Sequence, residues 1–287
     1  MAYVQRSLSV SQRRTCMVLN QARRTQRYVP KRRDDEGELV KSMLELVRVH
    51  PRYGYRRVWA LLRRKGWRIN RKRVHRLWKQ NSLKVPVKRH KKRRLGCSEN
   101  GCIRQRAEHR NHVWAWDFIF DRTGNGRSIK WLSVIDEFTR ECLALEVERN
   151  MRAGDVIDVL IELSAVRGVP MHIRSDNGPE FIAQAIRSWL RAAKIGALYI
   201  EPGSPWENGY AESFHSKLRD ELLAVEVFDT LAEAKALGMT WRLEYNHRRP
   251  HSSLGYKTPA SFVASLAPAP VATLPTPGPA KKQVILS

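Results

Sequence analysis

The feature that most constrains this chain is the uneven distribution of its charge. Residues 1–110 carry 33 lysines and arginines against 7 aspartates and glutamates, whereas residues 111–287 carry 20 against 21. The entire surplus, a formal net charge of +25, therefore resides in the first 110 residues. Such a segment repels itself unless a polyanion binds it. Nucleic acid is the polyanion that the pattern favours, and an anionic membrane or the ribosome is the alternative.

Composition excludes several other classes of protein. Hydrophobic residues make up 42% of the 287 residues, which is close to the globular norm and permits a substantial core. No stretch approaches roughly 18 uncharged apolar residues, and the N-terminus lacks the apolar segment of a secretory signal. We therefore expect no membrane association. The four cysteines, Cys16, Cys97, Cys102 and Cys142, are too few for a disulfide framework, which predicts a reducing, cytoplasmic location.

The basic half of the chain shows helical patterns throughout. Residues 1–33 are predicted to form a basic helical arm. Residues 34–95 are predicted to form a helix-turn-helix region with a basic linker, in which Gly66 separates two short amphipathic helices. A basic three-helix bundle that binds phosphates without reading bases is the alternative, and it too would bind nucleic acid.

The second helix of this pair is the candidate recognition helix. Asn70 can cap it, and its apolar residues Val74, Leu77 and Trp78 follow the i, i+3, i+4 spacing of a buried helix face. Its other residues are mostly basic, which is typical of a surface that follows DNA phosphates. The predicted DNA contacts are Arg71, Lys72, Arg73, Arg76 and Lys79.

From residue 113 the pattern changes to alternating strands and helices. Three strands with short connections come first and suggest an antiparallel meander, and two more strands alternate with helices after it. This order predicts an α/β fold with one mixed five-stranded sheet flanked by helices. Residues 263–287 are rich in alanine and proline and are predicted to be disordered. The predicted strands cover residues 113–120, 129–135, 143–147, 171–174 and 198–200, and the predicted helices cover residues 153–166, 180–193, 206–223 and 230–245.

A zinc site is a second possibility in the segment before the first strand. Cys97, Cys102, His109 and His112 are all zinc-ligand types. Zinc modules usually have a longer gap between the cysteine pair and the histidine pair, and His112 adjoins the first strand. The spacing therefore favours a loop with incidental thiols.

Three acidic residues occupy positions that suggest chemistry. Asp117 lies inside an aromatic strand, where burial of its carboxylate costs several kcal/mol unless a cation or hydrogen bonds compensate. Asp176 follows a strand end, and Glu212 lies in a helix after a Gly/Pro-containing loop. Mg²⁺ prefers oxygen ligands, and three carboxylates can hold two ions about 4 Å apart for phosphoryl transfer.

The sequences around these acids resemble a known family. Trp116-Asp117-Phe118, residues 175–181 (SDNGPEF) and residues 208–214 (NGYAESF) are similar to the three signatures of DDE transposases of the retroviral-integrase type. Between Asp176 and Glu212 lie 35 residues, which is the DD(35)E spacing of that family. Residues 53–57 (YGYRR) and 245–259 (YNHRRPHSSLGYKTP) also match, so the chain resembles the OrfB-type transposases of bacterial insertion sequences over roughly residues 40–262.

This resemblance implies a fold, a reaction and a cofactor. It implies that residues 96–262 form a ribonuclease-H-like integrase core in which Asp117, Asp176 and Glu212 bind two Mg²⁺ ions, with Mn²⁺ as the alternative. The family reaction is cleavage at the element ends by water, followed by attack of the freed 3′-hydroxyl on target DNA. The implied partners are double-stranded DNA, further copies of the chain and an upstream OrfA-type product, in a nucleoid-associated bacterial setting.

Helix geometry adds two candidate DNA contacts. At 100° per residue, Arg219 lies almost on the same helix face as Glu212, and His215 flanks that face. We expect both side chains to contact DNA phosphate, although Arg219 could instead pair with a nearby carboxylate. Asp136 is a rival for the first catalytic acid, but its place at a strand end before a turn favours a structural cap.

Two other functions remain open at the level of sequence. One is an inactive DNA-binding subunit or repressor that needs the upstream partner, because the chain shows no sustained heptad pattern. The other is a metal-dependent nuclease that hydrolyses strands without joining them. Joining activity separates the transposase from the nuclease, and an Asp176→Asn variant that binds DNA without reacting separates it from the inactive subunit.

Overall fold

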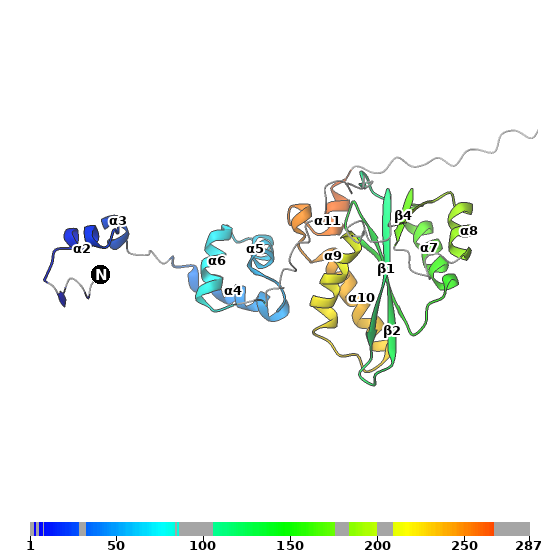
Figure 1. Ribbon diagram of the computed structural model, residues 1–287, viewed down its shortest axis with the longest axis horizontal. Helices are drawn as coiled ribbons and strands as arrows, with labels where there is room; N and C mark the ends of the chain where they lie inside the picture. The colour runs from blue at the N-terminus through cyan, green and yellow to red at the C-terminus, as the bar shows by residue number, and fades with distance from the viewer. Residues whose placement is uncertain are drawn as a thin grey trace, which may run out of the picture. The chain divides into compact units, whose positions relative to one another are not determined.

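The computed structural model describes residues 9–28, 33–83, 106–175, 184–199 and 209–266, together with Tyr3, Arg6, Ser7 and Val85. Its internal contacts divide the chain into two units, Met1–Pro51 and Arg52–Ser287, which we describe separately (Figure 1). In the described residues, no helix is both long and apolar enough to span a bilayer.

The first unit contains only helices where it is described. Its elements are α2 (Gln12–Val18), α3 (Arg23–Gln26) and α4 (Glu36–Val49). Helix α2 begins after Ser11, whose side chain accepts a hydrogen bond from the Arg14 N–H, as expected of a cap. Helix α2 lies within the segment predicted to be a helical arm, and the arginine-rich segment that follows contains a further helix, α3.

The second unit begins with the predicted pair of helices. These are α5 (Tyr55–Arg64) and α6 (Arg71–Gln80). Gly66 takes a φ of +94° in the turn between them, a conformation that favours glycine. Asn70 caps α6, its side-chain oxygen accepting from the Arg73 N–H at 2.8 Å. The Trp59 indole N–H donates to the Ile69 carbonyl at 3.0 Å and so ties α5 to the turn.

A five-stranded mixed sheet forms the centre of this unit, as predicted. The strand order is β3-β2-β1-β4-β5; β1 pairs antiparallel with β2 and parallel with β4. The meander of β1, β2 and β3 follows from the short connections between three consecutive apolar segments. The strands are β1 (Val113–Arg122), β2 (Ser128–Asp136), β3 (Cys142–Glu148), β4 (His172–Ser175) and β5 (Gly196–Tyr199).

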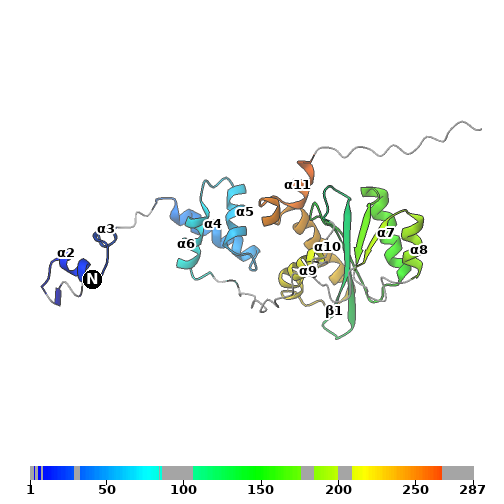
Figure 2. The ribbon, with the colours of Figure 1, turned by 45° about the horizontal axis from the view of Figure 1, so that its top comes forward.

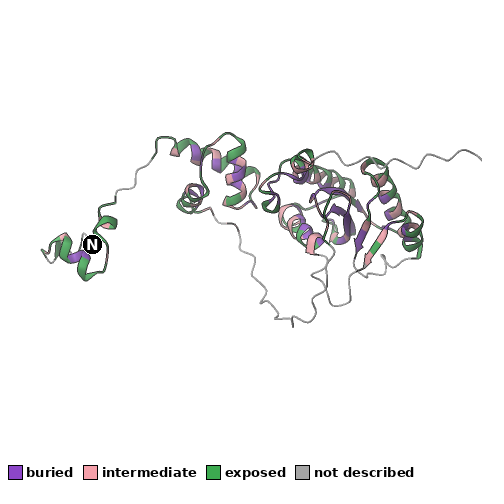
Figure 3. Cartoon of the chain, turned by 90° about the horizontal axis from the view of Figure 1, so that it is seen from above, coloured by how far each residue is buried: buried purple, intermediate pink, exposed green. Residues whose placement is uncertain are grey.

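Helices cover both faces of the sheet (Figures 1 and 2). Helices α7 (Ala153–Arg167) and α8 (Gln184–Ala192) pack on one face, over a core that includes Trp114 and Trp116. The other face carries α9 (Gly209–Leu218), its π-helical continuation η3 (Arg219–Leu223) and α10 (Leu231–His247), over a core that includes Trp131. Because both faces are covered, most of β1, β2 and β3 is buried, whereas the edge strand β5 is partly exposed (Figure 3).

The C-terminal region holds two elements that the pattern did not predict. A short 3₁₀ helix, η4 (Ser252–Leu254), follows α10, and α11 (Pro259–Ala264) begins with Thr258 as its cap. Helix α11 therefore includes residues 263 and 264, which we had assigned to the disordered tail. The rest of that tail lies outside the described residues.

Candidate active site

Asp117 lies in the middle of β1, between the buried aromatic residues Trp116 and Phe118. Side chains alternate between the two faces of a strand, so the Asp117 side chain points to the face opposite those of Trp116 and Phe118. It is 19% exposed to solvent. One carboxylate oxygen accepts a hydrogen bond from the Phe118 N–H at 2.7 Å. The Asp117 carboxylate is thus partly buried, and a backbone N–H compensates one of its oxygens.

Glu212 reaches the same place from the first turn of α9. Ala211, Phe214 and Leu218 are buried beneath the helix, which leaves Glu212 exposed on its outer side. Asp117 and Glu212 line one open cleft of about 640 Å³, which we call the carboxylate cleft. Its other described lining residues are Phe118, His215, Ser216, Arg219, Asp220 and Ala224.

Asp176, the third predicted carboxylate, lies outside the described residues. The strand before it is described up to Ser175, the last residue of β4. Strand β4 pairs in parallel with β1, and their last matched residues are Arg174 and Ala115. Each of these precedes its predicted catalytic aspartate by two residues, Asp176 after β4 and Asp117 in β1.

His215 lies behind Asp117 in the carboxylate cleft. Its Nδ1 is 3.4 Å from an Asp117 carboxylate oxygen, and its Nε2 is 2.9 Å from the Ser133 hydroxyl. The Ser133 hydroxyl also lies 3.1 Å from the Asp117 carbonyl oxygen, so Ser133 links His215 to the backbone of β1. This geometry favours a positioning role for His215 over the phosphate contact that the sequence suggested.

The protonation of His215 bears on what the cleft can hold. Burial, together with the nearby Arg219 guanidinium, lowers the pKa of His215 to about 3, so the ring is neutral at pH 7. A neutral imidazole places no positive charge beside Asp117, and carboxylates are the ligands that Mg²⁺ prefers. The donor set therefore fits a divalent cation held by Asp117 and Glu212.

Arg219 lines the carboxylate cleft together with Glu212, with which it was predicted to share a helix face. It is the first residue of the π-helical segment η3 and its side chain is exposed. The neighbouring carboxylate of Asp220 forms an ion pair with Arg52 instead. The cleft thus combines three carboxylates, of which Asp220 is paired with Arg52, with one exposed guanidinium, an arrangement suited to an oxygen-rich anion that also contacts metal ions.

The basic residues of α6 occupy its outer side. Val74, Leu77 and Trp78 are buried, as the i, i+3, i+4 spacing predicted. Arg73 is half-buried, and the Arg71 guanidinium lies 5.5 Å from the Trp59 ring centroid. The exposed cations of this face are Arg71, Lys72, Arg76 and Lys79.

Asp136 has the structural role that its position at a strand end predicted. It is buried, and its carboxylate accepts hydrogen bonds from the N–H groups of Asn111, Phe138 and Thr139 at 2.7–2.8 Å. A carboxylate with three backbone donors is a cap for the turn after β2 and not a free metal ligand.

The candidate zinc ligands are only partly described. His109 and His112 stack with their ring centroids 4.6 Å apart, whereas Cys97 and Cys102 lie outside the described residues. Within the described ranges, no three histidine, cysteine or acidic side chains come close enough to share a metal ion.

Sequence reasoning did not identify Ser133, which holds His215, or the ion cluster of Arg57, Glu221 and Arg249. For Ser133 the only signal is a small polar residue in an otherwise apolar strand. Arg249 lies in the quoted segment at residues 245–259, to which we had assigned no role.

Models of known protein families match both the helix-turn-helix region and the region that contains the sheet. An integrase core domain model matches residues 107–205, a second model of the same description matches residues 193–259, and an HTH-like domain model matches residues 32–92.

Three curated relatives match almost the whole chain. The 39.2 kDa protein of insertion element IS476 from Xanthomonas euvesicatoria is 38% identical over 89% of this chain and 73% of the relative. The 31.7 kDa protein of IS407 from Burkholderia multivorans is 36% identical over 92% and 94%. The transposase InsD of insertion element IS2 from Escherichia coli is 30% identical over 92% and 91%.

Solved structures with a similar arrangement include two retroviral integrases. A simian T-cell lymphotropic virus intasome chain aligns with 64% of this chain and 62% of its own, at a TM-score of 0.48 and 19% identity. The HTLV-2 integrase catalytic core, solved with magnesium, aligns over 55% and 99%, at a TM-score of 0.44 and 17% identity.

Proposed function

This chain belongs to the insertion-element transposases that carry an integrase core domain, and we propose that Asp117, Asp176 and Glu212 are its catalytic carboxylates. The protein is a DDE polynucleotidyl transferase that binds DNA. The observation that carries the residue assignment is the carboxylate cleft, in which Asp117 of β1 and Glu212 of α9 face one space. The parallel pairing of β1 and β4 supports Asp176 as the third member.

The same residues would hold the metal ions. We propose two Mg²⁺ ions, replaceable by Mn²⁺, with the three carboxylates as ligands and His215 orienting Asp117 from behind. When bound, the ions activate the attacking oxygen and stabilise the leaving oxygen of the phosphodiester.

The reaction proceeds in two phosphoryl transfers. In the first, a water oxygen forms a bond to phosphorus at the element end, and the bond to the 3′ oxygen breaks to release a 3′-hydroxyl. In the second, this hydroxyl attacks a target phosphodiester, and the target strand's own 3′ oxygen leaves. We propose that Arg219 holds a phosphate of the reacting strand and that the basic face of α6 binds duplex DNA.

Assembly is part of the proposal. Two element ends must react with one target, which requires at least two active sites, so we propose a homo-oligomer on DNA. An upstream OrfA-type product would supply the additional DNA-binding helices, and the assembly would act on the bacterial nucleoid.

The test of the function is a joining assay with purified full-length chain. Duplex oligonucleotides that carry the ends of the chain's own element are incubated with a target plasmid in Mg²⁺, Mn²⁺, Ca²⁺ or EDTA. We expect cleaved ends and joined products in Mg²⁺ and Mn²⁺ only. Hydrolysis without joining would indicate a nuclease. DNA binding without either reaction, also after addition of the upstream product, would contradict the catalytic proposal.

Arg219→Gln should weaken DNA binding without unfolding the protein, because this side chain is exposed on the rim of the cleft. Loss of one phosphate contact reduces the slope of log K against log salt by about one and lowers affinity for all sequences alike. Fluorescence anisotropy with a labelled duplex measures both. Arg191→Gln on α8 removes the same charge elsewhere, and an equal effect of the two variants would argue against a contact at Arg219.

A further inference from the structure

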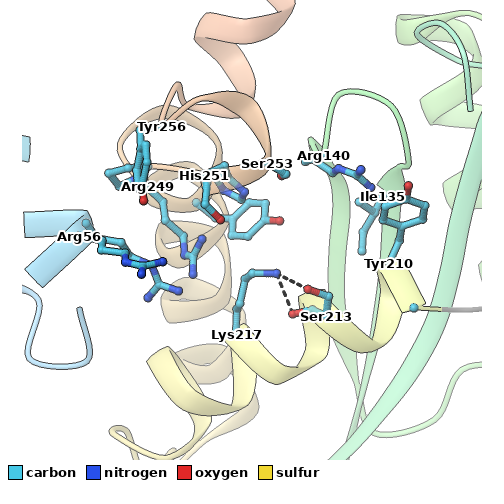
Figure 4. A pocket seen from close by; sticks show the side chains of 15 residues that line it. Arg56, Ile135, Arg140, Tyr210, Ser213, Lys217, Arg249, His251, Ser253 and Tyr256 are labelled. Carbon is cyan, nitrogen blue, oxygen red and sulfur yellow. Dashed lines mark hydrogen bonds between the residues drawn. The ribbon is translucent and has the colours of Figure 1, made fainter. Parts of the chain in front are cut away.

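A second concave site lies beside the carboxylate cleft, and we call it the basic pocket. It has a volume of about 560 Å³ and is built by α5, α9, the end of α10 and the segment before α11 (Figure 4). Five cationic side chains line it, and none of the described residues around it is acidic. These cations are Arg56, Arg57, Arg140, Lys217 and Arg249.

Among these cations, Arg57 and Arg249 share one counter-charge, whereas Arg56 and Lys217 hydrogen-bond neutral groups. Glu221, from behind the pocket, accepts a bidentate pair of hydrogen bonds from Arg249 at 2.7 Å and one from Arg57 at 2.9 Å. One carboxylate thus serves two guanidinium groups. The Arg56 side chain is exposed at the pocket and hydrogen-bonds a neutral group, the Tyr55 hydroxyl.

Lys217 shows the effect of the remaining charge. Its ammonium group donates to the Ser213 carbonyl at 2.9 Å and to the Ser213 hydroxyl at 2.6 Å, both of which are neutral (Figure 4). Burial and the positive charges of Arg249 and Arg57 lower the pKa of Lys217 to about 8. Burial is the larger cause and the two guanidinium groups add to it, so an anion in the pocket would favour the charged form of Lys217.

His251 provides an independent sign of a missing ligand. The side chain lines the basic pocket although the residue is only 4% exposed. Its ring also bonds to the backbone of Tyr245, while its Nε2 has no hydrogen-bond partner among the described residues. Buried polar atoms are normally satisfied, so an unpartnered one at a cavity wall points to a ligand or ordered water. Burial and the positive charges of Arg249, Lys217 and Arg57 lower the pKa of His251 to about 2, and an anion bound beside these cations would oppose their part of the shift.

We propose that the basic pocket binds a backbone phosphate of the DNA held by the transposase, an inference that rests on the proposed function. The ligand class follows from the lining: several arginines, a lysine and the hydroxyls of Ser213, Ser252 and Ser253 suit a phosphodiester. The volume leaves room for the adjoining sugars, which a single free phosphate would not need.

The position of the pocket on α9 argues for DNA over a free nucleotide. Ser213 and Lys217 line the basic pocket, whereas Glu212 and Ser216 line the carboxylate cleft. Each pair is spaced by four residues, and the two pairs are offset by one residue, so they mark adjacent faces of one helix about 100° apart. Helix α5, from the helix-turn-helix, contributes Arg56 and Arg57. A DNA strand is the anion that both regions bind.

The inference is tested by the salt dependence of DNA binding. The double variant Arg56→Gln/Lys217→Gln is compared with wild type and with the control Arg187→Gln/Arg191→Gln, which removes the same charge from α8 on the other face of the sheet. We expect the slope of log K against log salt to fall by about one in the pocket variant and to stay unchanged in the control. Equal slopes in both variants would overturn the proposal.

Further arms separate the remaining outcomes. Circular dichroism and thermal melting show whether the double variant folds. If it does not, the single variant Arg56→Gln, at an exposed position, is used for the same salt titration. Excess inorganic phosphate at constant ionic strength tests whether the pocket binds a free anion. If phosphate raised the melting temperature while the variants kept the wild-type slope of log K against log salt, the pocket would be an anion site that DNA does not use. That result would overturn the proposal. If wild type itself did not bind DNA, the proposed function would fail first.

Protection of Lys217 from acetylation gives a second readout that needs no variant. We expect duplex DNA to slow the modification of Lys217 several-fold, measured by mass spectrometry, relative to Lys235 on α10, which pairs with Glu148. Equal slowing of both lysines would contradict occupation of the pocket.

Discussion

Glu212→Gln is expected to reduce both DNA cleavage and strand joining at least about 10³-fold, because loss of a metal-binding carboxylate removes several kcal/mol of transition-state stabilisation. Glutamine keeps the shape of the side chain but not its charge. Glu212 is exposed on α9 with its neighbours Ala211 and Phe214 packed beneath it, so the fold should be unaffected. The assay is the Mg²⁺-dependent joining of element-end duplexes, with DNA binding measured in parallel.

Two comparisons make this result specific. Glu226→Gln changes the same charge at another exposed position beyond η3 and should leave both reactions unchanged. Asp117→Asn and Asp176→Asn should match Glu212→Gln in effect, since the three carboxylates act as a unit. If the Asp176→Asn variant joined strands at the wild-type rate, Asp176 would not be one of the catalytic carboxylates.

Glu221→Ala is expected to be the most destabilising single substitution outside the apolar core, by about 3–5 kcal/mol, because it leaves buried cations without their counter-charge. Arg249 is 2% exposed and Glu221 6% exposed in their side chains. The carboxylate accepts from both Arg57 and Arg249. Thermal melting should show a decrease of about 10 °C or more for a domain of this size.

The matched control is Glu226→Ala, which removes a carboxylate that is exposed to solvent. A melting temperature within about 2 °C of wild type is expected for it, since exposed surface substitutions change stability little. Replacing all three charged residues with apolar ones, Arg57→Met/Glu221→Leu/Arg249→Met, should recover much of the loss, because no buried charge is then unpaired. A mild effect of Glu221→Ala would show that water reaches this cluster.

Much of the fold followed from local pattern. The five strands of the sheet and the helices α7 and α10 were predicted within two residues of their observed ends, because each is an apolar or periodic segment between turn-forming residues. Helix α11 and the 3₁₀ helix η4 were missed. Their sequence, rich in serine, proline and glycine, looks like a loop, and only their capping and packing reveal the helices.

Part of the candidate site could be predicted from the sequence. The seven-residue spacing of Glu212 and Arg219 predicted a common helix face, and both residues line the carboxylate cleft together with Asp117. The contact of His215 with Ser133 was not predictable, because it joins residues 82 positions apart. The basic pocket was hidden for the same reason: its cations come from α5, the turn after β2, α9 and the segment after α10.

The ion cluster at Glu221 also limits how the protein can be re-engineered. Exchanging the helix-turn-helix of this chain for that of a relative would replace Arg57, and with it one of the two partners of Glu221. Arg52, paired with Asp220, would be lost in the same exchange if the graft started before it. A hybrid with altered DNA specificity must therefore inherit these arginines or change their acidic partners on η3 at the same time.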